Sequence, residues 1–109
     1  MKRIRIGSSP WGAIQRQIQL APGIVQVSTA GHGGIWLSPE RQAQLPAWAL
    51  EVPSGYCPKP IWWEEDCEAM VVVYVFWEEL KHHYPLTLTR EKVAEYIQQW
   101  GYLNMPQAA

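Results

Sequence analysis

One continuous apolar run constrains the fold of this chain more than any other feature. Residues 69–77 (AMVVVYVFW) are all apolar, and they follow the stretch WWEEDCE at residues 62–68. No other part of the sequence stays apolar for so long, so the remaining elements are expected to pack around it.

The run is compatible with a buried helix or a buried strand, because periodicity does not discriminate when both faces are apolar. Its valines favour a strand, since β-branched side chains lose rotamer freedom in a helix. Its length favours a helix, because strands usually end after about 4–8 residues. The preceding acids would also lie in a first helical turn, at the positive end of the helix dipole. We therefore predict a helix.

Strand and turn signals fill the N-terminal part. Residues 14–20 alternate between apolar and polar side chains, and residues 21–24 (APGI) fit a type II turn, with Pro second and Gly third. Residues 24–29 are then the returning strand, so we predict an antiparallel hairpin. Residues 35–37 (IWL) are a candidate third strand.

The N-terminal residues bear on assembly. Ile4 and Ile6 alternate with basic residues before the turn signal GSSP, as in a short edge strand. An uncovered edge strand pairs readily with another chain. We therefore expect a homodimer.

Two helix starts are recognisable. Ser38 is a predicted N-cap with Pro39 at the first helical position, and Pro46 ends this short helix. Thr89 is predicted to cap a last helix that Gly101 ends. Four apolar residues share one face of this last helix: Val93, Tyr96, Ile97 and Trp100.

Strands followed by helices are typical of an α+β domain. The chain has 109 residues and no internal repeat or linker, so residues 1–109 are expected to form a single domain. We predict an N-terminal antiparallel β-hairpin or small sheet packed against a central buried helix, plus a C-terminal amphipathic helix. Val71, Tyr74 and Val75 are the predicted core residues of the central helix.

Charge is divided unevenly along the chain. The net charge is −1, yet residues 1–39 carry four basic residues and no acid, whereas residues 40–80 carry eight acids. There is no dense basic patch, so no nucleic-acid partner is expected.

The sequence shows neither a signal peptide nor an apolar run of about 18 residues, which predicts a cytoplasmic protein without membrane association. Cys57 and Cys67 are then expected to be free thiols.

Two stretches carry the candidate chemistry. The loop GHGG at residues 31–34 leaves the imidazole open to a ligand, and its backbone N–H groups could hold an anion. The acids after Trp63 exceed what helix capping requires, and they could serve a cation, a basic partner or a hydroxyl group. Each stretch also has a structural reading, as a turn that needs glycine and as a helix start. We predict that the two lie side by side. The candidate binding residues are His32, Gly33, Gly34, Glu64, Glu65 and Asp66.

No catalytic or metal-binding motif accompanies these residues. Cys67 lies among acids, which disfavour a reactive thiolate, so it is predicted to be buried and inert. The histidines and cysteines match no zinc-binding spacing, and no phosphate-binding or dinucleotide-binding glycine motif is present. We expect no catalytic residues, no metal ion and no cofactor.

Four short stretches together support a family resemblance: SPWG (9–12), APGI (21–24), STAGHGGIWLSPER (28–41) and WWEEDCE (62–68). With them the chain resembles a small uncharacterised domain family found in phages, plasmids and integrative elements of proteobacteria. That family often has an aromatic residue where Ala69 stands here. The resemblance implies no activity. It implies a mobile-element origin, and small proteins of such origin are often inhibitors or decoys of host systems.

These observations support two hypotheses. The first is a non-catalytic interaction protein, an accessory or counter-defence factor that binds a host protein through its tryptophans and acids. The alternative is a small-ligand-binding or enzymatic site built from the GHGG loop and the acidic cluster. A pocket holding the imidazole and two carboxylates would favour the alternative, whereas a flat acidic face with exposed tryptophan would favour the first.

Overall fold

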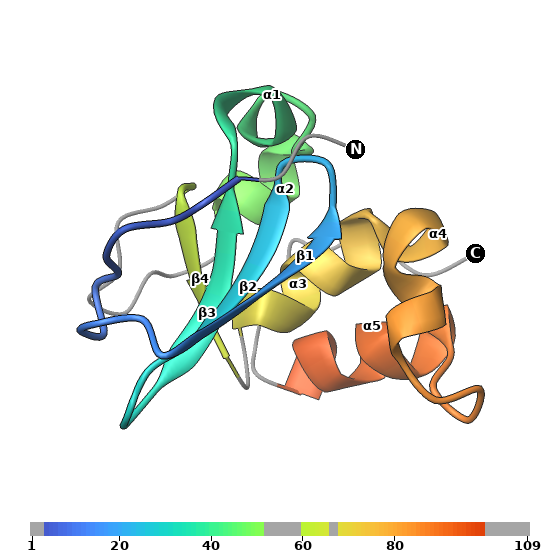
Figure 1. Ribbon diagram of the computed structural model, residues 1–109. Coiled ribbons are helices and arrows are strands. Elements are labelled where there is room, and N and C mark those ends of the chain that lie inside the picture. The colour runs from blue at the N-terminus through green and yellow to red at the C-terminus, as the bar shows by residue number, and fades with distance from the viewer. Residues whose placement is uncertain (1–3, 52–59, 66–67, 100–109) are drawn as a thin grey trace.

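The computed structural model describes residues 4–51, 60–65 and 68–99. The strands are β1 (Arg16–Ala21), β2 (Ile24–Ser28), β3 (Gly33–Leu37) and β4 (Trp62–Glu64). The helices are α1 (Pro39–Gln42), α2 (Ala47–Leu50), α3 (Glu68–Val75), α4 (Trp77–Leu80) and α5 (Arg90–Gln99), with a 3₁₀ turn at Lys81–His83. The strands form one antiparallel sheet in the order β1-β2-β3-β4, and α3, α4 and α5 lie on one side of it (Figure 1). The predicted α+β class is confirmed.

The predicted hairpin is also confirmed. β1 and β2 pair in antiparallel register around a turn at Pro22 and Gly23, with a bulge before Ala21. Gly23 has a φ of +77°, the backbone conformation that the third position of a type II turn requires.

β3 begins earlier than predicted. Gly33 and Gly34 were expected in a loop, but they lie opposite Ser28 and Val27 in the β2–β3 ladder. Glycine is normally depleted in strands, so the local sequence pattern missed these two residues.

The central run is helical, as predicted, but it starts later. Trp62–Glu64 form the strand β4, so Glu64 and Glu65 do not lie in the first helical turn, which holds Glu68. Pairing with β3 and complete burial of Trp63 stabilise the strand more than a helix dipole would stabilise exposed acids. Phe76 then adopts φ −105° and ψ 29°, which separates α3 from α4.

The core lies between the sheet and α3. Val71 and Tyr74 are buried, as predicted, but Val75 is only half-buried because it lines a shallow cavity of about 230 Å³ with Trp77 and Arg90. The largest fully buried side chains come from both layers: Ile24, Leu37, Trp63, Leu80 and Ile97.

The predicted helix caps are present. Ser38 Oγ accepts a hydrogen bond from the Arg41 N–H at 3.2 Å, and Thr89 Oγ1 accepts one from the Lys92 N–H at 3.2 Å. Val93 and Ile97 of α5 are buried, whereas Tyr96, expected on the same face, is 46% exposed. The expectations for Cys57, Cys67, Trp100 and Gly101 fall outside the described residues.

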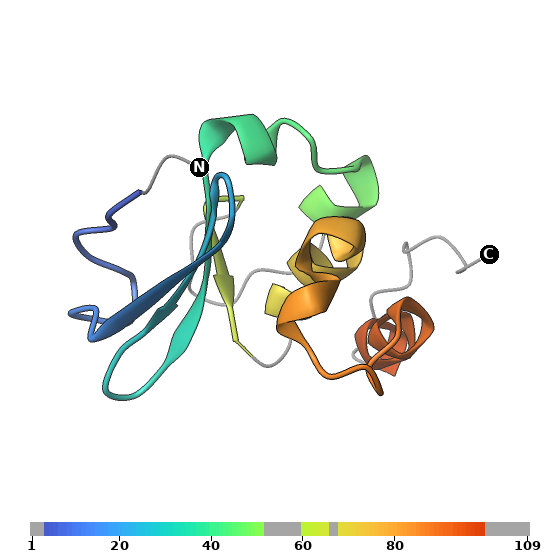
Figure 2. The same cartoon turned by 45° about the vertical axis from the view of Figure 1, so that its right-hand side comes forward.

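The predicted edge strand at Ile4–Ile6 is wrong. Ile4 and Ile6 donate their backbone N–H groups to the side-chain oxygens of Gln19 and Gln17, at 3.1 and 3.0 Å. The segment is therefore held by glutamine side chains instead of a backbone ladder. It crosses the side of the sheet opposite the helices (Figure 2).

Among the described helices, none is long and apolar enough to cross a membrane.

Val71→Asp should abolish cooperative folding, because Val71 is 0% exposed and an unpaired carboxylate in the core is very unfavourable. Thermal unfolding followed by circular dichroism measures this. Gln98→Asp, at an exposed position of α5, is the control and should melt close to the wild type. A cooperative transition for Val71→Asp would contradict the packing of α3.

Candidate functional site

The two candidate stretches lie on neighbouring strands. Gly34 is opposite Glu64, and the Glu65 N–H donates to the Gly33 carbonyl at 2.9 Å. The predicted adjacency therefore holds for Gly33, Gly34, Glu64 and Glu65. Asp66 lies outside the described residues.

His32 does not join them. It is exposed in the turn between β2 and β3, where its carbonyl accepts from Thr29 N and Oγ1 at 2.8 and 2.7 Å. Its N–H donates to Thr29 Oγ1 at 3.1 Å. Within residues 4–51, 60–65 and 68–99, no ion pair joins His32 to Glu64 or Glu65. These contacts give the His32 backbone a turn-forming role.

The glycines are required by close packing. A Cβ on Gly34 would lie 2.2 Å from the Trp63 carbonyl oxygen and 2.4 Å from Cη2 of Trp11. A Cβ on Gly33 would lie 2.6 Å from the Val27 carbonyl oxygen. Carbon atoms cannot approach this closely, so the GHGG stretch leaves room for an indole ring and for the neighbouring strands.

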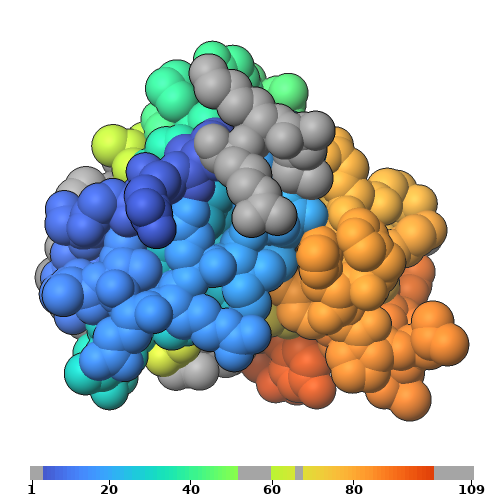
Figure 3. Space-filling model, in the orientation of Figure 1, coloured from blue at the N-terminus to red at the C-terminus, as the bar shows by residue number. Residues whose placement is uncertain are grey.

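A tryptophan face, defined as Trp11, Trp36, Trp62 and Glu64, lies on the side of the sheet opposite the helices. Trp36 and Trp62 are cross-strand partners in β3 and β4, and the rings of Trp11 and Trp62 meet edge to face with centroids 5.5 Å apart. All four residues are half-buried. In Figure 3 the N-terminal residues, in blue, spread over this side of the sheet beside the helical layer.

The Trp11 indole carries an unusual feature. Its Nε1–H is buried, yet it has no hydrogen-bond partner in the described part of the chain. Nearly all buried polar groups in proteins have a partner. The tryptophan face therefore includes a donor that the described residues do not pair. No local sequence pattern predicts this contact, because it depends on how residues 9–12 fold back over β3.

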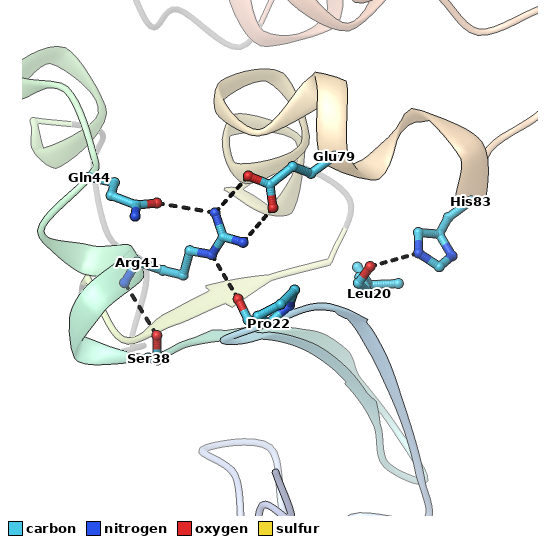
Figure 4. A network of polar contacts seen from close by, with 7 residues as sticks. All are labelled: Leu20, Pro22, Ser38, Arg41, Gln44, Glu79 and His83. Carbon is cyan, nitrogen blue, oxygen red and sulfur yellow. Dashed lines mark hydrogen bonds and ion pairs between the residues drawn. The ribbon is translucent and has the colours of Figure 1, made fainter. Parts of the chain in front are cut away.

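A second polar cluster, the Arg41 clamp, consists of Pro22, Ser38, Arg41, Gln44 and Glu79 (Figure 4). The Arg41 side chain is only 11% exposed. Its Nε donates to the Pro22 carbonyl at 2.8 Å, and Nη1 donates to Gln44 Oε1 and Glu79 Oε1 at 3.1 and 3.0 Å. Nη2 pairs with the other Glu79 oxygen.

The clamp joins the hairpin turn, α1 and α4. The Arg41 guanidinium also lies 5.0 Å from the centre of the Phe76 ring, and a Cβ on Gly23 would lie 2.4 Å from Ser38 Oγ. Beside the clamp, His83 Nε2 hydrogen-bonds to the Leu20 carbonyl at 2.8 Å. The Arg41 side-chain donors face partners of this chain, so the clamp has a structural role. Sequence reasoning treated residues 38–41 only as a helix start and missed it.

Metal binding gains no support from the geometry. Within the described ranges, no three side chains of His, Cys, Asp or Glu come together as potential ligands. Three cavities among the described residues, of about 560, 480 and 230 Å³, are lined by residues other than His32, Gly33, Gly34, Glu64 and Glu65.

Fold and face together define a small α+β domain with a half-exposed aromatic surface beside a carboxylate. A family model described as a domain of unknown function (DUF7007) matches residues 5–104, and the chain belongs to this family. The match agrees with the expectation of an uncharacterised domain. Comparisons with curated proteins and with solved structures found no match.

Gly34→Ala should destabilise the domain by about 1–3 kcal/mol or more, because the added methyl group has no room beside Trp63 and Trp11. Urea unfolding measures the free energy. Gly31→Ala is the matched control, since nothing lies within 4 Å of its Cβ, and it should change stability by less than about 0.5 kcal/mol. Equal effects of the two substitutions would contradict the packing of Trp11 on β3.

The Arg41 clamp predicts a pH dependence. Hydrogen bonds from Arg41, together with its charge, lower the pKa of Glu79 below the ordinary value of 4.5. A carboxyl group whose pKa falls on folding stabilises the protein above its unfolded-state pKa, and this stabilisation is lost as pH drops through the folded-state pKa. The free energy of unfolding should therefore fall as the pH drops below about 4.5.

Glu79→Gln tests this dependence, because it removes the part of the stability loss at acid pH that comes from protonation of Glu79. Glu79 is 49% exposed, so solvent screens the ion pair and the contribution should be modest. Urea unfolding across the acid range, with Glu91→Gln on the exposed side of α5 as control, measures it. An unchanged pH profile for Glu79→Gln would contradict the assignment.

Proposed function

We propose that this protein is a non-catalytic interaction domain that binds a partner protein through its tryptophan face. One observation carries the proposal. Three stretches far apart in the sequence, residues 9–12, 33–36 and 62–65, meet along β3 and β4 and present three half-buried indole rings beside a carboxylate. Tryptophan is enriched among the residues that dominate binding energy at protein interfaces.

The chemistry of this face suits a protein better than a small molecule. Small ligands bind in concave pockets that enclose most of their surface, and the three cavities of about 560, 480 and 230 Å³ among the described residues are not lined by the tryptophan face. Indole rings with a polar edge suit the partly wet centre of a protein interface. The enzymatic alternative needs His32 beside two carboxylates, and this pairing does not occur among the described residues.

The cellular setting of the proposal comes from the family resemblance. A mobile-element origin fits an accessory or counter-defence factor, whose partner would be a host protein in the cytoplasm. Fold alone does not assign such a role. The proposal therefore depends on identifying the partner.

Affinity capture from a host lysate tests the proposal. Wild-type protein should enrich a specific host protein, and Trp62→Ala should reduce the affinity of the purified pair about thirtyfold, as expected for an interface hot spot. Glu64→Arg should also weaken binding, and it changes a half-exposed side chain with little risk to folding.

Two substitutions on distant exposed surfaces serve as controls. Leu86→Ala removes a fully exposed apolar side chain before α5, and Glu95→Arg reverses an exposed charge on α5. Both should bind as the wild type does. Equal enrichment by all variants, or no enrichment over the affinity tag alone, would overturn the proposal.

A further inference from the structure

The outer edge of β4 leaves backbone groups open beside the tryptophan face. The Leu37 N–H donates to the Ile61 carbonyl at 3.0 Å, and the Glu65 N–H donates to the Gly33 carbonyl at 2.9 Å. Residues in an antiparallel ladder alternate between facing their partner and facing away. Since Ile61 and Glu65 face β3, Trp62 and Glu64 direct their N–H and C=O groups away from the sheet.

These four backbone groups have no hydrogen-bond partner in the part of the chain that the structure describes. Among the described strands, β4 is the last one on this side of the sheet. Edge strands with unpaired N–H and C=O groups accept further strands, and strand addition is a common way to bind an extended peptide. In β1, at the opposite edge, the Leu20 carbonyl by contrast already has a partner in His83 Nε2.

The side chains at this edge specify the chemistry of an added strand. Glu64 is half-exposed and Glu65 is exposed, and residues 60–65 contain no basic side chain. The Trp62 ring is half-buried, and Ile61 is 37% exposed. A cationic side chain on the added strand could pair with Glu64 and stack on an indole ring.

We propose that the edge of β4 binds an extended, basic segment of a partner protein as a fifth strand. This inference rests on the proposed function and specifies how the partner would bind. Backbone groups of Trp62 and Glu64 supply the ladder, while arginine or lysine at alternate positions faces the tryptophan face. A second copy is a poorer occupant, because it would bring the Glu64 and Glu65 carboxylates of both copies to one edge.

The test uses a capped octapeptide of alternating arginine and valine as the probe, with a glutamate–valine peptide as its charge-reversed counterpart. Binding is followed by NMR and by hydrogen exchange of backbone amides. In the free protein the amides of Trp62 and Glu64 should exchange rapidly. The arginine peptide should slow their exchange, and the glutamate peptide should not bind.

Two substitutions at one position separate charge from backbone. Glu64→Gln removes the charge and keeps the N–H, whereas Glu64→Pro removes both. Because this N–H faces away from β3, proline is compatible with the fold at this edge. Glu64→Gln should weaken binding a few-fold by losing a partly exposed ion pair. Glu64→Pro should weaken it about tenfold more by losing ladder hydrogen bonds.

Several results would overturn strand addition: slow exchange of both amides in the free protein, no binding of the arginine peptide at millimolar concentration, or equal affinities of Glu64→Gln and Glu64→Pro. Self-association that protects the same amides would assign the edge to a second copy and also overturn it. If Trp62→Ala abolishes capture of the host partner while these amides stay unprotected, the interaction role stands and only strand addition fails.

Discussion

The buried guanidinium of Arg41 connects parts of the molecule that are distant in the chain, and their arrangement depends on it. It donates to the Pro22 carbonyl at the hairpin turn, to Gln44 after α1 and to Glu79 on α4. A buried cation that loses its partners is strongly unfavourable. The hairpin, α1 and α4 therefore cannot shift independently while Arg41 stays buried. Arg41 thus fixes the β1–β2 end of the sheet against the helical layer.

Local signals in the sequence predicted the parts of the fold that local interactions stabilise. The hairpin follows from apolar alternation and from Gly23 at the position where φ must be positive. The caps at Ser38 and Thr89 follow from side chains that accept hydrogen bonds from N–H groups three residues later. The strand β4 could not be found in this way. Its three residues gain their stability by pairing with β3 and by burying Trp63 in the core.

In the candidate site, too, part of the arrangement could be predicted from the sequence and part could not. The adjacency of the GHGG stretch and the acids was anticipated from a common function, and strand pairing brings Gly34 and Glu64 together. His32 stays apart because Thr29 draws its backbone into the β2–β3 turn. Trp11 could not be assigned, since its contact with Gly34 requires the path of the N-terminal segment over the sheet. The contacts of Arg41 were not predicted, because its partners at residues 22 and 79 lie far from it in the sequence.

The residues in the four stretches that suggested the family resemblance fall into two physical groups. Gly23, Ser38 and Arg41 have a structural reason inside the domain, since each fills or permits a contact of the Arg41 clamp. Contacts inside the domain explain Trp11 and Trp62 only in part. A buried indole N–H without a partner costs about 1–3 kcal/mol, and a half-exposed ring gains only part of its hydrophobic stabilisation.

Features that destabilise an isolated domain often mark its functional sites. Here the Trp11 N–H and the outward backbone groups of Trp62 and Glu64, which have no partner in the described part of the chain, lie with the half-exposed rings along β3 and β4. One extended partner segment could satisfy the backbone groups, cover the rings and pair with the Glu64 carboxylate at once. These backbone groups and rings contribute little to the stability of the isolated domain, and their contacts with the partner would then stabilise the complex.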